Sequence, residues 1–126
     1  MNENLENKVY KYKSSKERAI GDFLTYKNIL FEYEKPTLVI DDNKPKIYYP
    51  DFTLNDFAII LEYFGINGDV GYNKRSKHKE EVYKQNKLDF ISVYPEHFNN
   101  NWQGYIKESI KNILDSRYNK YNKTFH

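Results

Sequence analysis

The strongest constraint on the fold of this chain is a nearly unbroken apolar run at residues 57–64, which reads FAIILEYF. Such a run, ended by Gly65, is typical of a central strand buried on both faces of a sheet. Its only carboxylate is Glu62. An ionised carboxylate in that setting is costly unless it is paired or bound to a metal. A glutamate at the strand end that reaches solvent or a salt bridge is the alternative.

Asp51 follows Pro50 on the strand that we expect to precede this run. Proline cannot donate to a sheet ladder, so Pro50 predicts a sheet edge or a bulge. Strand alternation predicts that Asp51 shares one face with Ile47 and Tyr49. We expect the turn at Asn55-Asp56 to bring Asp51 close to Glu62. Two carboxylates at close range repel each other, and a bound divalent cation commonly offsets this repulsion. A shared proton or an acidic surface patch is the alternative.

Hydrophobic periodicity predicts one α/β domain over residues 1–126, with residues 1–13 as a flexible arm. Ser14 and Ser15 are candidate caps of the first helix. The expected elements are a helix over 14–28, strands over 31–34, 46–54 and 57–64, a helix over 74–86, a strand over 88–94, and a helix from 102 to 118 or 121. This order, αβββαβα, predicts a mixed four-stranded sheet flanked by helices, with turn or loop segments at 41–45 and 95–101.

Two further charged residues lie where an apolar side chain is expected. Glu17 is three residues before Ile20, on the buried stripe of the first helix, although an acidic residue there also complements the helix dipole. Lys79 is three residues before Val82 and is therefore expected to point toward the sheet. A lysine stem that runs along the edge of the core is the alternative.

Positive charge is concentrated in two segments of a chain whose net charge is +2. Residues 72–87 carry a net +4 and residues 107–123 a net +3, so the remainder carries −5. This asymmetry suits a surface that follows phosphates beside a carboxylate-rich centre, although solvated helix faces are the alternative. The absence of cysteine excludes a disulfide scaffold and a thiolate zinc site. Without a signal peptide or a membrane-spanning run, we expect a cytoplasmic protein with no membrane contact.

Glu17, Pro50-Asp51-Phe52, Glu62 and Lys79 lie in this order on a helix, two strands and a helix. The arrangement resembles the PD-(D/E)XK nuclease superfamily, which includes restriction endonucleases, Holliday junction resolvases and repair nucleases. The similar segments read ERAIGDFL, YYPDFTLND, AIILEYFG, HKEEVY and FISVY, over residues 14–94. The usual Glu-x-Lys motif would have lysine at the position of Phe64, and in the resembling subset the lysine lies on the next helix, at Lys79. Tyr49, where relatives often have arginine, is a second departure.

The resemblance implies a restriction-endonuclease-like fold and an Mg²⁺-dependent DNA endonuclease in which Mn²⁺ can substitute. The metal would be held by Asp51, Glu62 and the backbone carbonyl of Tyr63. Glu17 would bind it directly, through water or through a second ion. Lys79 would orient the attacking water or stabilise the transition state. The expected DNA contacts are Lys74, Arg75, Lys77 and Lys84.

The small size favours a structure-selective enzyme, either a Holliday junction resolvase or a repair or phage-type nuclease, encoded by a host, a phage or a mobile element. A resolvase makes two cuts, so a homodimer is expected. Aromatic residues of the last helix are candidates for its interface, and packing in the core explains them equally well. The alternative function is a non-catalytic DNA-binding or interaction module with a nuclease-like fold.

Overall fold

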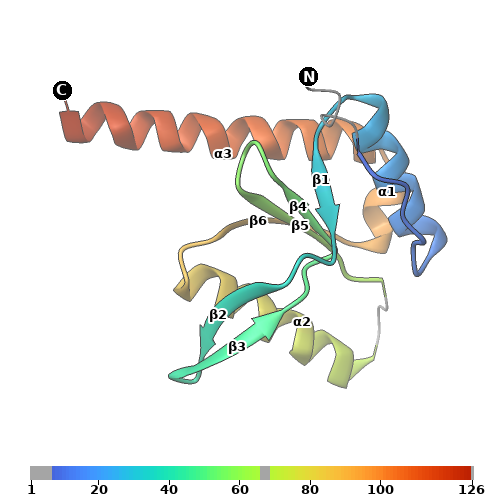
Figure 1. Cartoon of the computed structure of the whole chain (residues 1–126), viewed down its shortest axis with the longest axis horizontal. Coiled ribbons are helices and arrows are strands. Elements are labelled where there is room, and N and C mark those ends of the chain that lie inside the picture. Colours follow the sequence, from blue (N-terminus) through green and yellow to red (C-terminus); the bar gives the residue numbers. More distant parts are fainter. Residues whose placement is uncertain (1–6, 66–68, 126) are drawn as a thin grey trace.

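The computed structural model of the chain describes residues 7–65 and 69–125. A four-stranded mixed sheet has the strand order β1-β4-β5-β6, and β2 and β3 form a separate two-stranded sheet. The predicted mixed α/β architecture with a four-stranded sheet is therefore confirmed. The elements, shown in Figure 1, are α1 (Ser15–Tyr26), β1 (Phe31–Tyr33), β2 (Thr37–Asp41), β3 (Lys44–Tyr48), β4 (Phe52–Leu54), β5 (Ile59–Tyr63), α2 (Val70–Gln85), β6 (Asp89–Val93), the 3-10 helix η2 (Pro95–Asn99) and α3 (Trp102–Phe125).

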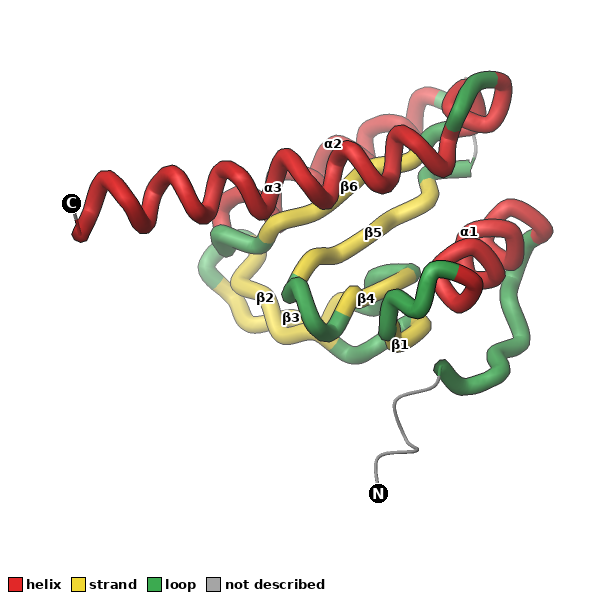
Figure 2. The backbone as a smooth tube through the Cα atoms, turned by 90° about the horizontal axis from the view of Figure 1, so that it is seen from above, coloured by secondary structure: helices red, strands yellow, loops and turns green. Residues whose placement is uncertain are grey.

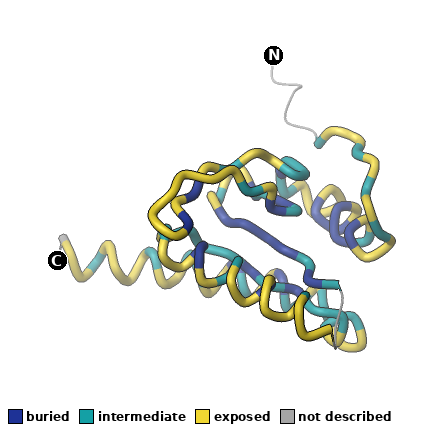
Figure 3. Tube along the Cα trace, turned by 90° about the horizontal axis from the view of Figure 1, so that it is seen from below, coloured by how far each residue is buried: buried dark blue, intermediate teal, exposed yellow. Residues whose placement is uncertain are grey.

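The central strand β5 pairs antiparallel with β4 and parallel with β6. Alternation along it divides the sheet into two faces. Ile59 and Leu61 belong to the apolar core under α1 and α3, whereas the side chain of Glu62 contacts α2 on the other face. The first four residues of β5 are buried and the last, Tyr63, is partly buried, and Figure 3 shows this buried strand in the middle of the molecule. The prediction of a buried central strand is confirmed, although it begins two residues later than expected, at Ile59.

The last helix, α3, divides into a packed part and a projecting part. Trp102, Tyr105 and Ile106 pack in or against the core, and Ile106 is fully buried. Beyond them the helix extends past the sheet, as Figure 2 shows, and the side chains of Tyr118 and Tyr121 are exposed. Core packing therefore accounts for the first aromatic residues of this helix and not for the last two.

The second helix begins four residues before the predicted Lys74, because Asp69 caps it by accepting a hydrogen bond from the backbone N–H of Tyr72. The helix buries Val82 and Tyr83 against the sheet, and the ring centroid of Tyr83 lies 5.6 Å from that of Phe90. The face of the sheet that carries Glu62 is therefore covered by α2.

The prediction of a single strand over 46–54 is wrong. Its residues belong to β3 and β4, which lie in different sheets, and β3 pairs with the unpredicted strand β2. Pro50 supplies no N–H to a ladder, and the chain passes from one sheet to the other at this point. Asp51 therefore precedes β4 and does not share a strand face with Ile47 and Tyr49. Positive φ angles at Asp42 and Asn43, 56° and 61°, form the tight turn between β2 and β3.

The β2–β3 hairpin is attached to α2 at two points, and Figure 1 shows it beside that helix. The side-chain amide of Asn86 donates to the carbonyl oxygen of Ile40 at 2.9 Å and accepts from its N–H at 2.9 Å. Nearer the start of the helix, Nε2 of His78 lies 3.0 Å from Oδ1 of Asp41. The hairpin is thereby held against the helix that covers Glu62.

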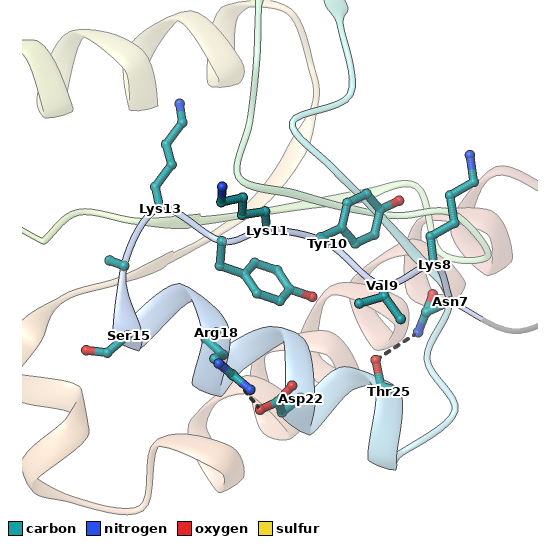
Figure 4. A pocket seen from close by; sticks show the side chains of 12 residues that line it. Asn7, Lys8, Val9, Tyr10, Lys11, Lys13, Ser15, Arg18, Asp22 and Thr25 are labelled. Carbon is teal, nitrogen blue, oxygen red and sulfur yellow. Dashed lines mark hydrogen bonds and ion pairs between the residues drawn. The ribbon is translucent and has the colours of Figure 1, made fainter.

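The described part of the predicted arm, residues 7–13, is docked against the domain. Asn7 donates to the carbonyl oxygen of Ile29 at 3.0 Å and accepts from the N–H of Phe31 at 2.9 Å. The ring centroid of Tyr12 lies 4.9 Å from that of Tyr33. Residues 1–6 lie outside the described residues. In the pocket between the arm and α1, Figure 4 shows that the side chains of Lys8, Lys11 and Lys13 point away from the helix, as does that of Tyr10.

Arg117 connects α3 to the turn that leads into β5. Its guanidinium donates to the carbonyl oxygens of Phe57 at 2.6 Å and Ala58 at 3.1 Å and to Oδ2 of Asp89 at 2.8 Å.

We expect Arg117→Ala to lower the free energy of unfolding by about 2 kcal/mol, because two carbonyl groups and a carboxylate lose a charged donor. Lys111→Ala, which removes only an exposed pair with Asp115, should cost about 0.5 kcal/mol or less. Equal losses in urea unfolding of the two variants would contradict this role.

Candidate functional site

Asp51 and Glu62 are joined by reciprocal hydrogen bonds where β4 meets β5. The backbone N–H of Asp51 donates to Oε1 of Glu62 at 2.6 Å, and the backbone N–H of Tyr63 donates to Oδ2 of Asp51 at 2.7 Å. Glu62 is only 1% exposed, and Asp51 is partly buried. The structure thus brings together the two carboxylates that the sequence singles out.

The burial of this pair disfavours its negative charge. Burial and, after it, the nearby charge of Glu62 raise the pKa of Asp51 to about 8, although the hydrogen bond from the Tyr63 N–H acts in the opposite direction. Burial also raises the pKa of Glu62, against the opposing effect of Lys79. Without a bound cation the pair therefore holds less than two full negative charges near neutral pH.

Lys79 reaches this pair from α2. Its Nζ lies 2.8 Å from Oε2 of Glu62, so both oxygens of Glu62 have a protein donor. The lysine side chain is 39% exposed while the glutamate side chain is 1% exposed, so the ion pair runs from solvent into the protein. The predicted direction of Lys79, toward the sheet, is confirmed.

Glu17 is not brought into one cluster with Asp51 and Glu62. Its carboxylate accepts from the hydroxyl of Ser14 at 3.2 Å and from the hydroxyl of Tyr33. Its helix, α1, packs on the apolar face of the sheet, and the charge of Glu17 still adds to the raised pKa values of Asp51 and Glu62. Among the described residues, no three histidine or carboxylate side chains are close enough to hold one metal ion. Ser14 is the N-cap of α1 and accepts the backbone N–H of Glu17.

The oxygen atoms of Asp51, Glu62 and the Tyr63 carbonyl fit a divalent cation in their chemistry. Mg²⁺ takes hard oxygen ligands, and it is commonly held by one or two carboxylates while it keeps several waters. A cation would also offset the burial and the repulsion by Glu62 that together raise the pKa of Asp51. The pair therefore has both the donor atoms and the electrostatic need for such an ion.

The four basic residues predicted to contact DNA separate into two groups. Lys74 and Arg75 line a pocket with Tyr48, His78 and Lys79. Lys77 and Lys84 are exposed on α2 and do not line it. The site therefore has basic side chains on one side of the helix, next to the lysine that binds Glu62.

Sequence reasoning missed an anchor for this pocket on the hairpin. Asp41 is 4% exposed and accepts hydrogen bonds from the hydroxyl of Tyr48 at 2.9 Å and Nζ of Lys46 at 3.1 Å, as well as binding His78. The His78 contact, followed by the Tyr48 and Lys46 hydrogen bonds, lowers the pKa of Asp41 to about 2. The alternating segment 37–41 before the turn was the available signal, and it predicts a hairpin when it is taken together with that turn.

Tyr33 and Tyr83 were also missed, and nothing in the sequence distinguishes them from the other tyrosines among the 13 in the chain. Tyr33 binds Glu17. Tyr83 is fully buried, and its hydroxyl has no hydrogen-bond partner among the described residues. Burial raises the pKa of Tyr83, and the nearby charges of Glu62 and Asp51 add to the effect. Both tyrosines therefore extend the polar environment of the carboxylates.

No protein-family model, curated protein or solved structure matches this chain. The site itself therefore has to indicate the function. It combines a buried carboxylate pair, a lysine bound to one of its members, and a basic pocket that begins at the same lysine.

No helix in the described part of the chain is both long and apolar enough to cross a membrane.

The raised pKa of Asp51 makes stability depend on pH. The folded protein holds a proton on Asp51 up to about pH 8, whereas in the unfolded chain this carboxyl group loses its proton near the ordinary aspartate pKa of 3.8. Without divalent cations, the free energy of unfolding should therefore fall from about pH 4 to about pH 8. Asp51→Asn abolishes this titration, so its stability relative to the wild type should rise over that interval in urea unfolding with EDTA. The exposed substitution Asp56→Asn should show no such trend, and a difference between Asp51→Asn and wild type that is flat with pH would contradict the prediction.

Proposed function

We propose that this protein is a metal-dependent DNA endonuclease with a restriction-endonuclease-like fold, which hydrolyses phosphodiester bonds with Mg²⁺ and accepts Mn²⁺. The observation that carries the proposal is the buried Asp51–Glu62 pair with Lys79 bound to Glu62. A protein that needs charge only for stability gains little from burying two carboxylates side by side, because their desolvation and repulsion are unfavourable. A cation site at which chemistry takes place explains the cost.

The residues of the site have separate roles in this proposal. Asp51, Glu62 and the Tyr63 carbonyl hold the cation, which when bound lowers the pKa of a coordinated water and neutralises charge on the scissile phosphate. Lys79, fixed by Glu62, orients the attacking water or donates to a phosphate oxygen as its charge grows. Glu17, held by Ser14 and Tyr33, acts through water or a second ion.

The substrate in this proposal is DNA, held by the basic residues that line the pocket beside Lys79. The version that we propose is a structure-selective enzyme, such as a Holliday junction resolvase or a repair or phage-type nuclease. A homodimer is part of the resolvase version, and the exposed Tyr118 on the projecting part of α3 is a candidate interface residue.

A second candidate is a non-catalytic DNA-binding or interaction module with a nuclease-like fold. The observation that favours it is the lack, among the described residues, of any three side chains able to hold one metal ion. Both oxygens of Glu62 also have protein donors already. This module predicts DNA binding that is indifferent to Mg²⁺ and to the loss of Asp51.

Cleavage assays separate the two candidates. With Mg²⁺ or Mn²⁺, the wild type should cut at least one member of a panel of linear duplex, single strand, flap, mismatch and four-way junction. Asp51→Asn and Glu62→Gln should each slow cleavage at least about 100-fold, because the cation loses a ligand. Asp56→Asn should cut like the wild type. Cleavage at the wild-type rate by both site variants would show that the metal pair has been wrongly assigned.

The role of Lys79 is tested against Lys77 on the same helix. Lys79→Gln should lower kcat about 100-fold, as expected when a donor to the developing charge is lost. The fold should survive, because Glu62, whose pKa is already raised, can take up a proton in place of the ion pair. Lys77→Gln, an exposed change of the same chemistry, should leave kcat within about twofold in single-turnover cleavage. Equal effects of the two substitutions would remove Lys79 from the mechanism.

A further inference from the structure

The pocket beside the carboxylate pair is formed by two parts of the chain that are distant in sequence. Tyr48 comes from the hairpin, and Lys74, Arg75, His78 and Lys79 come from α2. The four helical residues are two adjacent pairs one turn apart, so they share one side of the helix. The pocket has a volume of about 390 Å³ and reaches the catalytic pair through Lys79, which binds Glu62.

The walls of this pocket are mainly apolar although most of its residues are charged. The ring of Tyr48 and the hydrocarbon stems of the lysine and arginine side chains supply the apolar surface, as amphipathic side chains commonly do. A site for an inorganic anion alone would surround it with donors. This pocket instead offers a flat apolar surface with charge near it, which suits a ligand that has both an aromatic ring and a phosphate.

Tyr48 is held in one orientation. Its hydroxyl donates to Oδ2 of the buried Asp41 at 2.9 Å. Its ring meets the ring of the fully buried Tyr83 edge to face, with 6.0 Å between the centroids. A ring fixed in this way can stack on a ligand without losing further conformational freedom.

Two of the cations in the pocket, Lys74 and Arg75, have no carboxylate partner among the described residues, although the Arg75 guanidinium lies 5.8 Å from the centroid of the Tyr72 ring. Lys79 is paired with Glu62, and His78 is bound to Asp41. No ion pair within the described residues engages Lys74 or Arg75. Arg75 can also offer two donors to one phosphate group.

We infer that this pocket receives one unpaired nucleotide of a DNA strand, with its base against Tyr48 and its phosphates at Lys74 and Arg75. The inference rests on the proposed function and names the substrate class: DNA with an unpaired nucleotide next to the bond that is cut. A volume of about 390 Å³ lies within the range of about 300–1,000 Å³ typical of small-ligand sites. A base in a duplex is stacked between its neighbours and cannot enter, whereas an unpaired base can stack on a tyrosine.

Binding of labelled oligonucleotides, followed by fluorescence anisotropy in EDTA, tests this inference without cleavage. Tyr48→Leu should raise the Kd for single-stranded DNA about 5- to 150-fold, the range for losing one base–aromatic stack, and should leave the Kd for a duplex unchanged. Tyr48→Phe keeps the ring and should bind within a few-fold of the wild type. An oligonucleotide with abasic sites should bind to wild type and Tyr48→Leu equally. The circular dichroism of each variant confirms its fold.

The cations are tested by a matched pair of double substitutions on one helix. The logarithm of the association constant for a single strand falls as the logarithm of the salt concentration rises. The double substitution Lys74→Gln and Arg75→Gln should make this negative slope shallower by about 1.4, since each phosphate contact contributes about 0.7. Lys77→Gln with Lys84→Gln removes the same number of charges outside the pocket and should change the slope clearly less. Equal slopes in the two double variants would overturn the inference, as would wild-type single-strand binding by Tyr48→Leu or an equal loss on duplex and single strand.

The same proteins distinguish failure of this inference from failure of the nuclease proposal. If the wild type cuts DNA with Mg²⁺ while Tyr48→Leu keeps the same preference among the substrates, the nucleotide pocket is wrong and the nuclease stands. If Tyr48 controls single-strand binding while no substrate is cut, the binding assignment stands and the nuclease is wrong.

Discussion

Glu62 accepts a hydrogen bond on each of its two carboxylate oxygens. These two hydrogen bonds connect β5 to the start of β4 and to α2. The Asp51 backbone N–H holds the start of β4 against β5 at 2.6 Å, and the Lys79 ammonium holds α2 against the same strand at 2.8 Å. Because the carboxylate is almost fully buried, both contacts act with little screening by solvent. This one side chain therefore contacts both the start of β4, at Asp51, and the end of the basic pocket, at Lys79.

The two faces of the four-stranded sheet differ in the polarity of the side chains that pack on them. The face under α1 and α3 is an apolar core, with Ile20, Leu24 and Ile106 fully buried. The face under α2 is mixed: Val82 and Tyr83 are buried there, and Glu80 accepts hydrogen bonds from the hydroxyls of Ser92 at 2.5 Å and Tyr94 at 2.7 Å. Stability is supplied mainly by the first face, so the second can carry groups whose burial is unfavourable. Glu17 lies on α1, which packs on the apolar face, and it does not form one metal-binding cluster with Asp51 and Glu62 among the described residues.

Local signals in the sequence were enough to identify the residues of the site, but they did not predict the strands and sheets that surround these residues. Glu62 was identified because a carboxylate within AIILEYF requires a partner, and Lys79 because its spacing from Val82 puts it on the inner side of its helix; the partner of each proved to be the other. The interruption at Pro50 was noticed but was interpreted within one strand. Whether the chain continues in the same sheet after a proline is decided by pairing with distant strands, and local pattern does not contain that information.

The hairpin shows the same limit. The hydrogen bonds that attach it, from Asn86 to Ile40 and from His78 to Asp41, join residues 46 and 37 positions apart. The side chain of His78 is 60% exposed, yet it binds a buried carboxylate. Exposure alone therefore did not indicate its role. The pocket that begins at Tyr48 exists only because this hairpin is held against α2.

The central claim, that Asp51 and Glu62 form a divalent-cation site, is tested most directly by calorimetric titration of the protein with Mg²⁺ and Mn²⁺ at pH 7 in buffers of different ionisation enthalpy. Since burial raises the pKa of Asp51 to about 8, binding at this site must release a proton. We expect saturable binding with proton release in the wild type and loss of both in Asp51→Asn. Absence of binding, or identical binding and proton release in the wild type and the variant, would contradict the claim.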